Sequence, residues 1–150
     1  MMKHLENNFR LDENPWCLDF PPMRKLILKK KPASWNVVAR KHYWTVKKEF
    51  ESWQEATLEA VAGTRPRALP IPASWYPVQI TFVARWKVNR RHDIDSLLVK
   101  PVVDAIVSLG LLPDDDLSHV GRVCFEGVIG ATDGADTLEI RIEPMRTPKA

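Results

Sequence analysis

The stretch RRHDIDSLLVKPVVDA, residues 90–105, lies where an apolar strand pattern gives way to an apolar helix pattern. The segment before it, VQITFVARWKV (78–88), alternates in polarity, which predicts a strand with one well-buried face. The buried side is expected to contain Val78, Ile80, Phe82 and Ala84, and the other side Gln79, Thr81, Val83 and Arg85. The segment after it predicts a helix from Lys100 or Pro101 to Leu109, with Gly110 as the stop.

Further elements are expected on both sides of this unit. Strands are predicted at 25–31, 122–130 and 137–144, and a helix at 45–62 that ends at Gly63. The apolar face of that helix is expected to contain Val46, Phe50, Trp53, Leu58 and Val61. PASWN (32–36) is expected to be a turn and the proline-rich 64–77 a loop. The order strand, helix, strand, helix, strand, strand indicates an α/β fold with a single mixed sheet and helices packed against it.

Length and composition indicate one globular domain. The chain has 150 residues, which suits a domain at 23–150 after an N-terminal extension at 1–22. Hydrophobic residues at 45% and charged residues at 27% argue against disorder. No apolar run reaches the length of a membrane span, and MMKHLENNFR has no signal-peptide core, so a cytoplasmic protein is expected. Cys17 and Cys124 lie far apart and predict neither a zinc site nor a disulfide framework.

Two acidic clusters lie at the expected ends of elements. Residues two apart in extended chain point to the same face, about 6.5–7 Å apart along the strand, so Asp93 and Asp95 are expected to project together. Such paired carboxylates favour a cation between them, and hard oxygen ligands suit Mg²⁺ or Mn²⁺. The helix that follows is expected to return the chain to PDDD (113–116), which can add a third carboxylate. The alternative interpretation is a solvated strand end and a solvated turn.

Histidine ligands are a weaker alternative. The doublet His92-Asp93 is similar to that of hydrolases with adjacent His and Asp ligands, but beyond His119 the chain offers only His4 and His42. Lys100 and Asp104, four apart at the helix start, are expected to pair, which stabilises an exposed helix by a few tenths of a kcal/mol.

The segment from 21 to 50 is strongly basic. It contains nine lysines and arginines, and its single acid is Glu49. This charge indicates either an anionic partner such as nucleic acid or a solvated face. Trp35 and Trp44, interleaved with Arg40 and Lys41, can stack on unpaired bases, although tryptophans beside a helix start more often belong to the core.

These motifs resemble a known family. DIDSLLVKPVVDAIVSLGLLPDDD (93–116) resembles the core signature of the RusA family of Holliday junction resolvases, which occurs in bacteria and in phages. The shared features are an Asp-x-Asp, a Lys shortly after it, an Asp-Ala on the helix, a Gly and an Asp-Asp. PASWN is similar to the family's Pro-x-Ser-x-Asn loop. The resemblance covers about residues 25–144 and implies a RusA-like fold.

The resemblance also implies the site and the partners. It implies metal-binding acids at Asp93, Asp95 and Asp115, with Asp114 as the runner-up in the last cluster, and a catalytic lysine at Lys100. Bound Mg²⁺, or Mn²⁺ in its place, and a homodimer on four-way DNA junctions are implied as well, and two equivalent strands suit a two-fold dimer. The helix 101–112 and the segment 44–53 are the expected dimer surfaces. The DNA-binding residues are expected to be Lys29, Lys30, Lys31, Asn36, Arg40, Lys41, Arg90 and Arg91.

Two positions depart from the family pattern. Ser96 stands where the family has Asn, and Lys100 is one residue farther from Asp95 than in the commonest form of the motif. The expected activity is hydrolysis of a DNA phosphodiester that requires Mg²⁺, in recombination and repair. Two alternatives remain: a nuclease of the same fold that prefers flaps or forks, and a non-catalytic module that binds branched DNA.

Overall fold

A computed structural model describes residues 23–63, 70–88, 96–130 and 134–145. The expected extension at 1–22 lies outside the described residues. The strands are β1 (Arg24–Leu28), β2 (Val78–Trp86), β3 (Val120–Ile129) and β4 (Thr137–Pro144), and the helices are α3 (Trp35–Val38), α4 (Tyr43–Ala62), α5 (Lys100–Ser108) and the 3₁₀ helix η1 (Ala73–Trp75). The predicted order of the main strands and helices is confirmed, with α3 and η1 as additional short helices.

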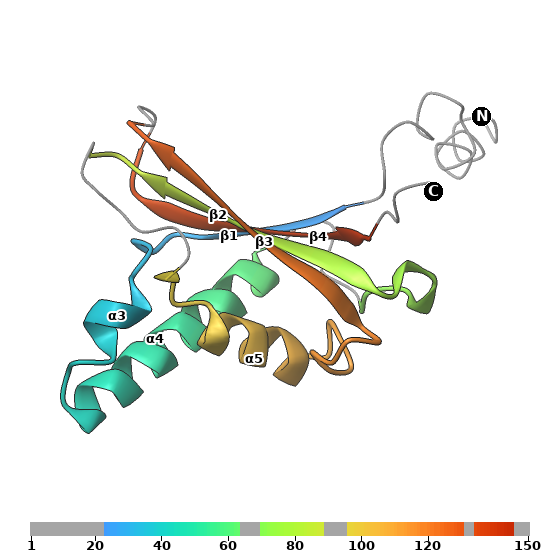
Figure 1. Ribbon diagram of the computed structural model, residues 1–150, viewed down its shortest axis with the longest axis horizontal. Helices are drawn as coiled ribbons and strands as arrows, with labels where there is room; N and C mark the ends of the chain where they lie inside the picture. The colour runs from blue at the N-terminus through green and yellow to red at the C-terminus, as the bar shows by residue number, and fades with distance from the viewer. Residues whose placement is uncertain (1–22, 64–69, 89–95, 131–133, 146–150) are drawn as a thin grey trace.

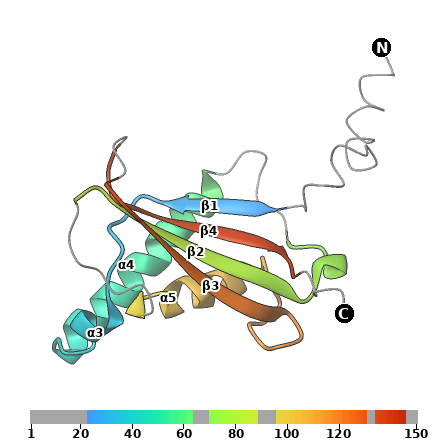
Figure 2. The same ribbon diagram turned by 45° about the horizontal axis from the view of Figure 1, so that its top comes forward.

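The four strands form one mixed sheet in the order β1-β4-β2-β3. β4 pairs antiparallel with both β1 and β2, whereas β2 and β3 are parallel. A parallel pair requires a crossover connection, and α5 supplies it between β2 and β3. Both views place α4 and α5 on the same face of the sheet (Figures 1 and 2). The predicted α/β fold, a single mixed sheet with helices packed against it, is therefore confirmed.

The hydrophobic core lies between the sheet and the two long helices. Residues of β1, β2 and β4 that point to the helix side of the sheet are nearly all buried, whereas most of the edge strand β3 is exposed. On the helices the fully buried contacts come from Trp53 on α4 and from Val102 and Ile106 on α5. None of the described helices is long and apolar enough to cross a membrane.

The buried stripe of α4 differs from the prediction at one position. Trp53 is fully buried, and Val46, Phe50 and Val61 pack partly against the core as expected. Leu58 is 51% exposed, so its assignment to the buried face was wrong, and Thr57 takes that place. The stripe advances by three or four residues, and Thr57 follows Trp53 by four, with its hydroxyl donating to the Trp53 carbonyl at 2.8 Å.

The strand β2 is buried on both faces, although only one buried face was expected. Thr81 and Val83 lie on the side away from the helices and are 4% and 1% exposed. In the register of the sheet, Arg141 of β4 lies opposite Thr81, and Glu126 of β3 lies opposite Val83. The ion pair between Arg141 Nη1 and Glu126 Oε2, at 3.8 Å, thus spans β2 and covers it.

The helix α5 ends in the manner predicted at Gly110. Gly110 has a φ of 79°, its N–H donates to the Val107 carbonyl at 3.0 Å, and the Leu111 N–H donates to the Ile106 carbonyl at 3.1 Å. This pair of bonds is the Schellman motif, which favours glycine because the left-handed conformation is strained for other residues. It reverses the chain after α5 and sends 113–116 back toward the first turn of the helix.

Candidate metal and nucleic-acid site

The loop after β1 packs against the chain that follows the DID motif. Ser34 Oγ lies 3.1 Å from Ser96 Oγ, Ser34 forms a β-bridge with Leu97, and the Leu98 N–H donates to the Ala33 carbonyl at 2.8 Å. PASWN is not a turn throughout, since α3 begins at Trp35 after Ser34. The structure therefore brings the PASWN segment together with residues 96–98, across this short bridge.

Lys100 connects the start of α5 with the acidic segment after it. Its Nζ lies 3.0 Å from Asp104 Oδ1, so the predicted pairing of these residues is confirmed. The same Nζ lies 3.5 Å from Asp115 Oδ2, fifteen positions along the chain. The expected return of the chain to the helix start is thus observed, and Lys100 and Asp115 lie together at the exposed end of α5.

The three consecutive aspartates have different surroundings. Asp114 Oδ1 accepts the backbone N–H of Asp115 at 2.7 Å. Asp116 accepts the Ser118 hydroxyl at 3.0 Å and contacts the ring nitrogen Nδ1 of His119. Only the Asp115 carboxylate, among these three, contacts Lys100. Asp114 and Asp116 therefore shape the turn, whereas Asp115 faces the start of α5.

The ionisation of two of these groups follows from their contacts. The hydrogen bond and the charge of Asp104 raise the pKa of Lys100 above its ordinary value of 10.5, and Asp115 adds to this effect. Lys100 is therefore a cation at neutral pH. Hydrogen bonds from His119 and then Ser118 lower the pKa of Asp116, which keeps that carboxylate charged.

The oxygen donors at these two contacts are of the kind that Mg²⁺ prefers. Asp115 supplies a carboxylate that is 40% exposed, and Ser34 and Ser96 supply hydroxyls. Asp93 and Asp95, the other expected ligands, lie outside the described residues. The described parts of the chain contain no cluster of three His, Cys, Asp or Glu side chains suited to a metal. The chemistry of Asp115 fits the expected ion, and a complete set of ligands depends on Asp93 and Asp95.

The expected DNA-binding residues fall into three groups. Lys29, Lys31, Asn36, Arg40 and Lys41 are exposed. Lys30 is largely enclosed, because its Nζ lies 2.9 Å from Ser52 Oγ, 3.7 Å from Glu49 Oε1 and 5.0 Å from the Trp53 ring centroid. Its side chain supports the packing of β1 against α4. Arg90 and Arg91 lie outside the described residues.

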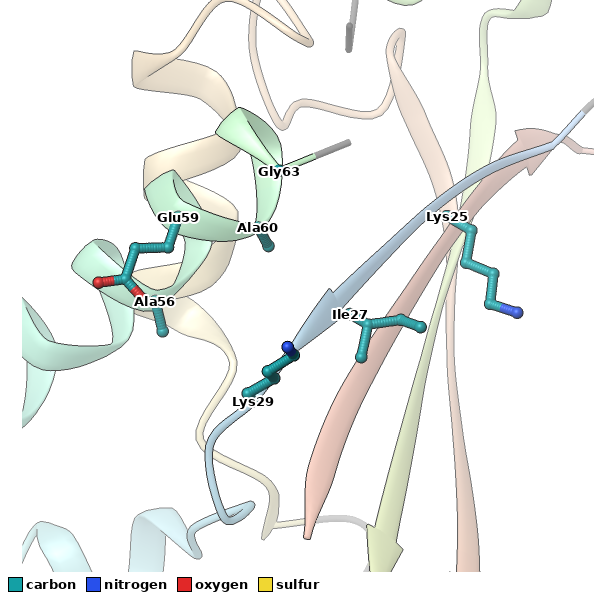
Figure 3. Close-up of a pocket in the computed structure, with 7 residues that line it drawn as sticks. All are labelled: Lys25, Ile27, Lys29, Ala56, Glu59, Ala60 and Gly63. Carbon is teal, nitrogen blue, oxygen red and sulfur yellow. The ribbon is translucent and has the colours of Figure 1, made fainter. Parts of the chain in front are cut away.

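A groove of about 420 Å³ separates β1 from the last turns of α4. Figure 3 shows Lys25, Ile27 and Lys29 on the strand side and Ala56, Glu59 and Ala60 on the helix side. Lys100 and Asp115 do not line this groove. Two lysines and one glutamate are among its lining residues, and it is separate from the acidic end of α5.

Trp35 and Trp44 are exposed, contrary to the core position favoured for tryptophans beside a helix start. Their exposed fractions are 43% and 59%. The hydrophobic positions of this region are filled instead by Val38 and Trp53. Tyr43 was not identified from the sequence as a candidate stacking residue. It is 67% exposed and its ring contacts Trp44. Its place next to Trp44 in the sequence could have identified it. No local signal identified Ser34 as the partner of Ser96, because 62 positions separate them.

No family model matches this sequence, and no curated protein is significantly similar to it.

Proposed function

We propose that this protein is a RusA-like, Mg²⁺-dependent endodeoxyribonuclease that cuts branched DNA, chiefly four-way junctions. The observations that carry the proposal are the contact between Lys100 and Asp115 and the hydrogen bond between Ser34 and Ser96. These two contacts involve the lysine, one acid and the serine loop of the RusA-like signature. Ser96 directly follows the proposed ligand Asp95 in the sequence.

The proposed metal ligands are Asp93, Asp95 and Asp115. Bound Mg²⁺, or Mn²⁺ in its place, would activate the attacking water and offset the charge that develops on the phosphate. The chain's own contribution is then orientation: Ser34 holds Ser96 by a hydrogen bond, and the Schellman motif at Gly110 returns Asp115 to the helix start.

Lys100 is proposed to stabilise charge on the scissile phosphate and on the leaving oxygen. Its side chain is 64% exposed, so a phosphate can approach the ammonium without displacing the core. The raised pKa keeps Lys100 protonated at neutral pH, which excludes it as a general base there. Asp104 fixes the ammonium at the start of α5 and is a positioning residue rather than a ligand in this proposal.

The proposed phosphate contacts are the exposed cations of the segment after β1. Lys29, Lys31, Arg40 and Lys41 remain in this set with Asn36, and Arg90 and Arg91 of the segment before the DID motif complete it. Lys30 is omitted because its ammonium is engaged with Glu49 and Ser52. Binding through several phosphates makes the affinity steeply dependent on salt.

A homodimer is proposed because a four-way junction presents two equivalent strands. The helix α5 is a poor interface, since Pro101, Val102, Ala105 and Ile106 already face its own core. β3 forms one edge of the described sheet, and its Val123, Phe125 and Ile129 are 47%, 36% and 46% exposed. An exposed apolar edge strand of this kind favours pairing with a second chain.

The second candidate function is binding of branched DNA without cleavage, and one observation favours it. The Lys100 ammonium already neutralises Asp104 and Asp115, in the place of a bound metal ion. A further alternative, a nuclease of the same fold that prefers flaps or forks, differs only in the substrate.

The deciding experiment compares wild type with Asp95→Asn on an end-labelled four-way junction, beside fork, flap and linear duplex controls, with Mg²⁺, Mn²⁺ or EDTA. We expect paired symmetric nicks on the junction with either metal, none in EDTA, and none with the variant. Junction binding by the variant should equal or exceed that of wild type, because one negative charge facing DNA is gone. Junction binding without cleavage in any divalent metal would establish the binding module instead.

A further inference from the structure

Exposed aromatic and basic side chains gather at the end of the molecule formed by α3 and the first turns of α4. We call this surface the aromatic–basic patch, and its residues are Trp35, Arg40, Lys41, Tyr43, Trp44 and Lys47. Figures 1 and 2 both show α3 beside the beginning of α4, at the opposite end of that helix from β1.

The aromatic rings of the patch are presented to solvent rather than to the core. Tyr43 and Trp44 meet edge to face with ring centroids 5.2 Å apart, and Lys47 Nζ lies 5.5 Å from the Trp44 ring centroid. Trp35 packs edge-on against Phe50 at 5.7 Å and still exposes 43% of its surface. Rings braced by such neighbours keep a defined orientation, as a stacking surface requires.

The charge around these rings selects an anionic partner. Residues 35–48 contain Arg40, Lys41, Lys47 and Lys48 and no acid. The next acid, Glu49, pairs with Lys30 on the core side. A second copy of the chain placed symmetrically on the same surface would bring cations against cations. Aromatic faces between cations are the combination that binds the bases and phosphates of single-stranded nucleic acid.

One residue of the patch lies beside the bridge between the loop after β1 and residues 96–98. Trp35 directly follows Ser34, whose hydroxyl contacts Ser96 at 3.1 Å, and Ser96 lies four positions before Lys100.

We propose that the aromatic–basic patch is a stacking platform for unpaired bases of DNA next to a branch point. It gives the protein affinity for single-stranded DNA that duplex DNA of equal length does not share, because paired bases do not offer their faces. The choice of DNA as the ligand rests on the proposed function, whereas the stacking itself does not require cleavage.

The test is binding of the full chain to a labelled oligothymidylate about 16 nucleotides long and to a duplex of equal length, by fluorescence anisotropy in EDTA. Trp44→Ala and Tyr43→Ala should each weaken single-strand binding by about 5- to 150-fold, the range expected for loss of one stacked base. Trp44→Phe should retain most of the affinity because it keeps a ring. Leu58→Ala, a similarly exposed change on the same helix, should have no effect.

Three outcomes would overturn the inference. The first is unchanged single-strand binding in both alanine variants, and the second is an equal loss for single strand and duplex, which would indicate phosphate contacts alone. The third is a loss of binding to vesicles of anionic phospholipid with oligonucleotide binding intact, which would indicate a membrane surface.

The two proposals have separate readouts, which are junction cleavage with a divalent metal and oligothymidylate binding in EDTA. If no metal supports junction cleavage and Trp44→Ala still weakens single-strand binding, the stacking platform stands and the nuclease proposal fails. If junctions are cut and both alanine variants bind normally, the nuclease proposal stands and the platform fails.

Discussion

Ser34 Oγ and Ser96 Oγ lie 3.1 Å apart although 62 positions separate them in the chain. This partly buried hydrogen bond fixes the residue after the DID motif to the loop after β1. We expect Ser96→Ala and Ser34→Ala each to lower the free energy of unfolding by about 0.5–1.5 kcal/mol, with the double variant costing less than the sum. Chemical denaturation of all four proteins measures this coupling, and strictly additive losses would mean that the hydroxyls do not interact.

Replacement of neighbouring aspartates should separate the site from the turn. Asp115 contacts Lys100, whereas Asp114 accepts a backbone N–H of its own turn. We expect Asp115→Asn to reduce the junction cleavage rate by about 10²-fold or more, since a metal ligand is lost. Asp114→Asn is the matched control and should leave the rate within a few-fold of wild type. If Asp114→Asn lowered the cleavage rate more than Asp115→Asn, the metal ligand would be Asp114 and not Asp115.

The protonation of Lys100 predicts the alkaline side of the cleavage profile. Its pKa is raised, so the ion pair with Asp104 is intact at neutral pH and is lost only as the pH rises through that raised pKa. We expect Lys100→Gln to lower the cleavage rate by about 10²–10³-fold and Lys100→Arg to lower it less. Between about pH 6 and pH 9, titration of Lys100 should cause no change in the single-turnover cleavage rate. A change in rate near neutral pH that is present in wild type and absent in Lys100→Gln would contradict the charge-stabilising role of Lys100.

Glu139 is a buried carboxylate on the face of the sheet away from the helices. It is 3% exposed, and cations of Arg141, Lys25 and Arg85 surround it at 2.5, 3.4 and 3.6 Å. Burial by itself raises the pKa of Glu139, but the hydrogen bond from Arg141 and the three positive charges outweigh it and hold the pKa below its ordinary value of 4.5. This carboxylate therefore stabilises the fold above the unfolded-state pKa, and its contribution is lost as the pH falls through the lowered folded-state pKa.

We expect Glu139→Gln to cost about 2 kcal/mol in the free energy of unfolding at pH 7, because the cations lose their buried partner. The difference from wild type should narrow as the pH falls below the ordinary value of 4.5 and then through the lowered pKa, because the wild-type carboxylate becomes protonated. Glu126→Gln is the control, since its side chain is 55% exposed and its pair with Arg141 should contribute below about 1 kcal/mol. Urea denaturation across this pH range measures the stability of both variants. If the difference between Glu139→Gln and wild type does not change with pH, ionisation of Glu139 is not its cause.

Gly110 should be sensitive to any side chain despite the open space around it. A Cβ there would meet nothing within 4 Å, so the cost of Gly110→Ala comes from the φ of 79° alone. We expect a loss of about 1–2 kcal/mol in the free energy of unfolding, with Gly110→Asn losing less because asparagine tolerates this conformation. Equal thermal stability of the alanine variant and wild type would show that the chain reverses without the left-handed residue.

The amino-acid sequence by itself determined the main elements and their order. The strand β2, the helix α5 and its stop at Gly110 follow from local patterns, and each of these elements was confirmed because neighbouring residues impose them. Leu58 was misplaced because a helical face is narrow, and a shift of one residue from Thr57 turns a side chain by about 100°.

Tertiary structure decided the contacts between distant segments. The packing of PASWN on residues 96–98 joins positions that no local pattern relates, and so does the cover that Arg141 and Glu126 give to β2. The exposure of Trp35 and Trp44 was decided in the same way, because Val38 and Trp53 fill the core beneath them. Burial depends on which side chains compete for a limited interior, and that competition is settled only when the helices dock on the sheet.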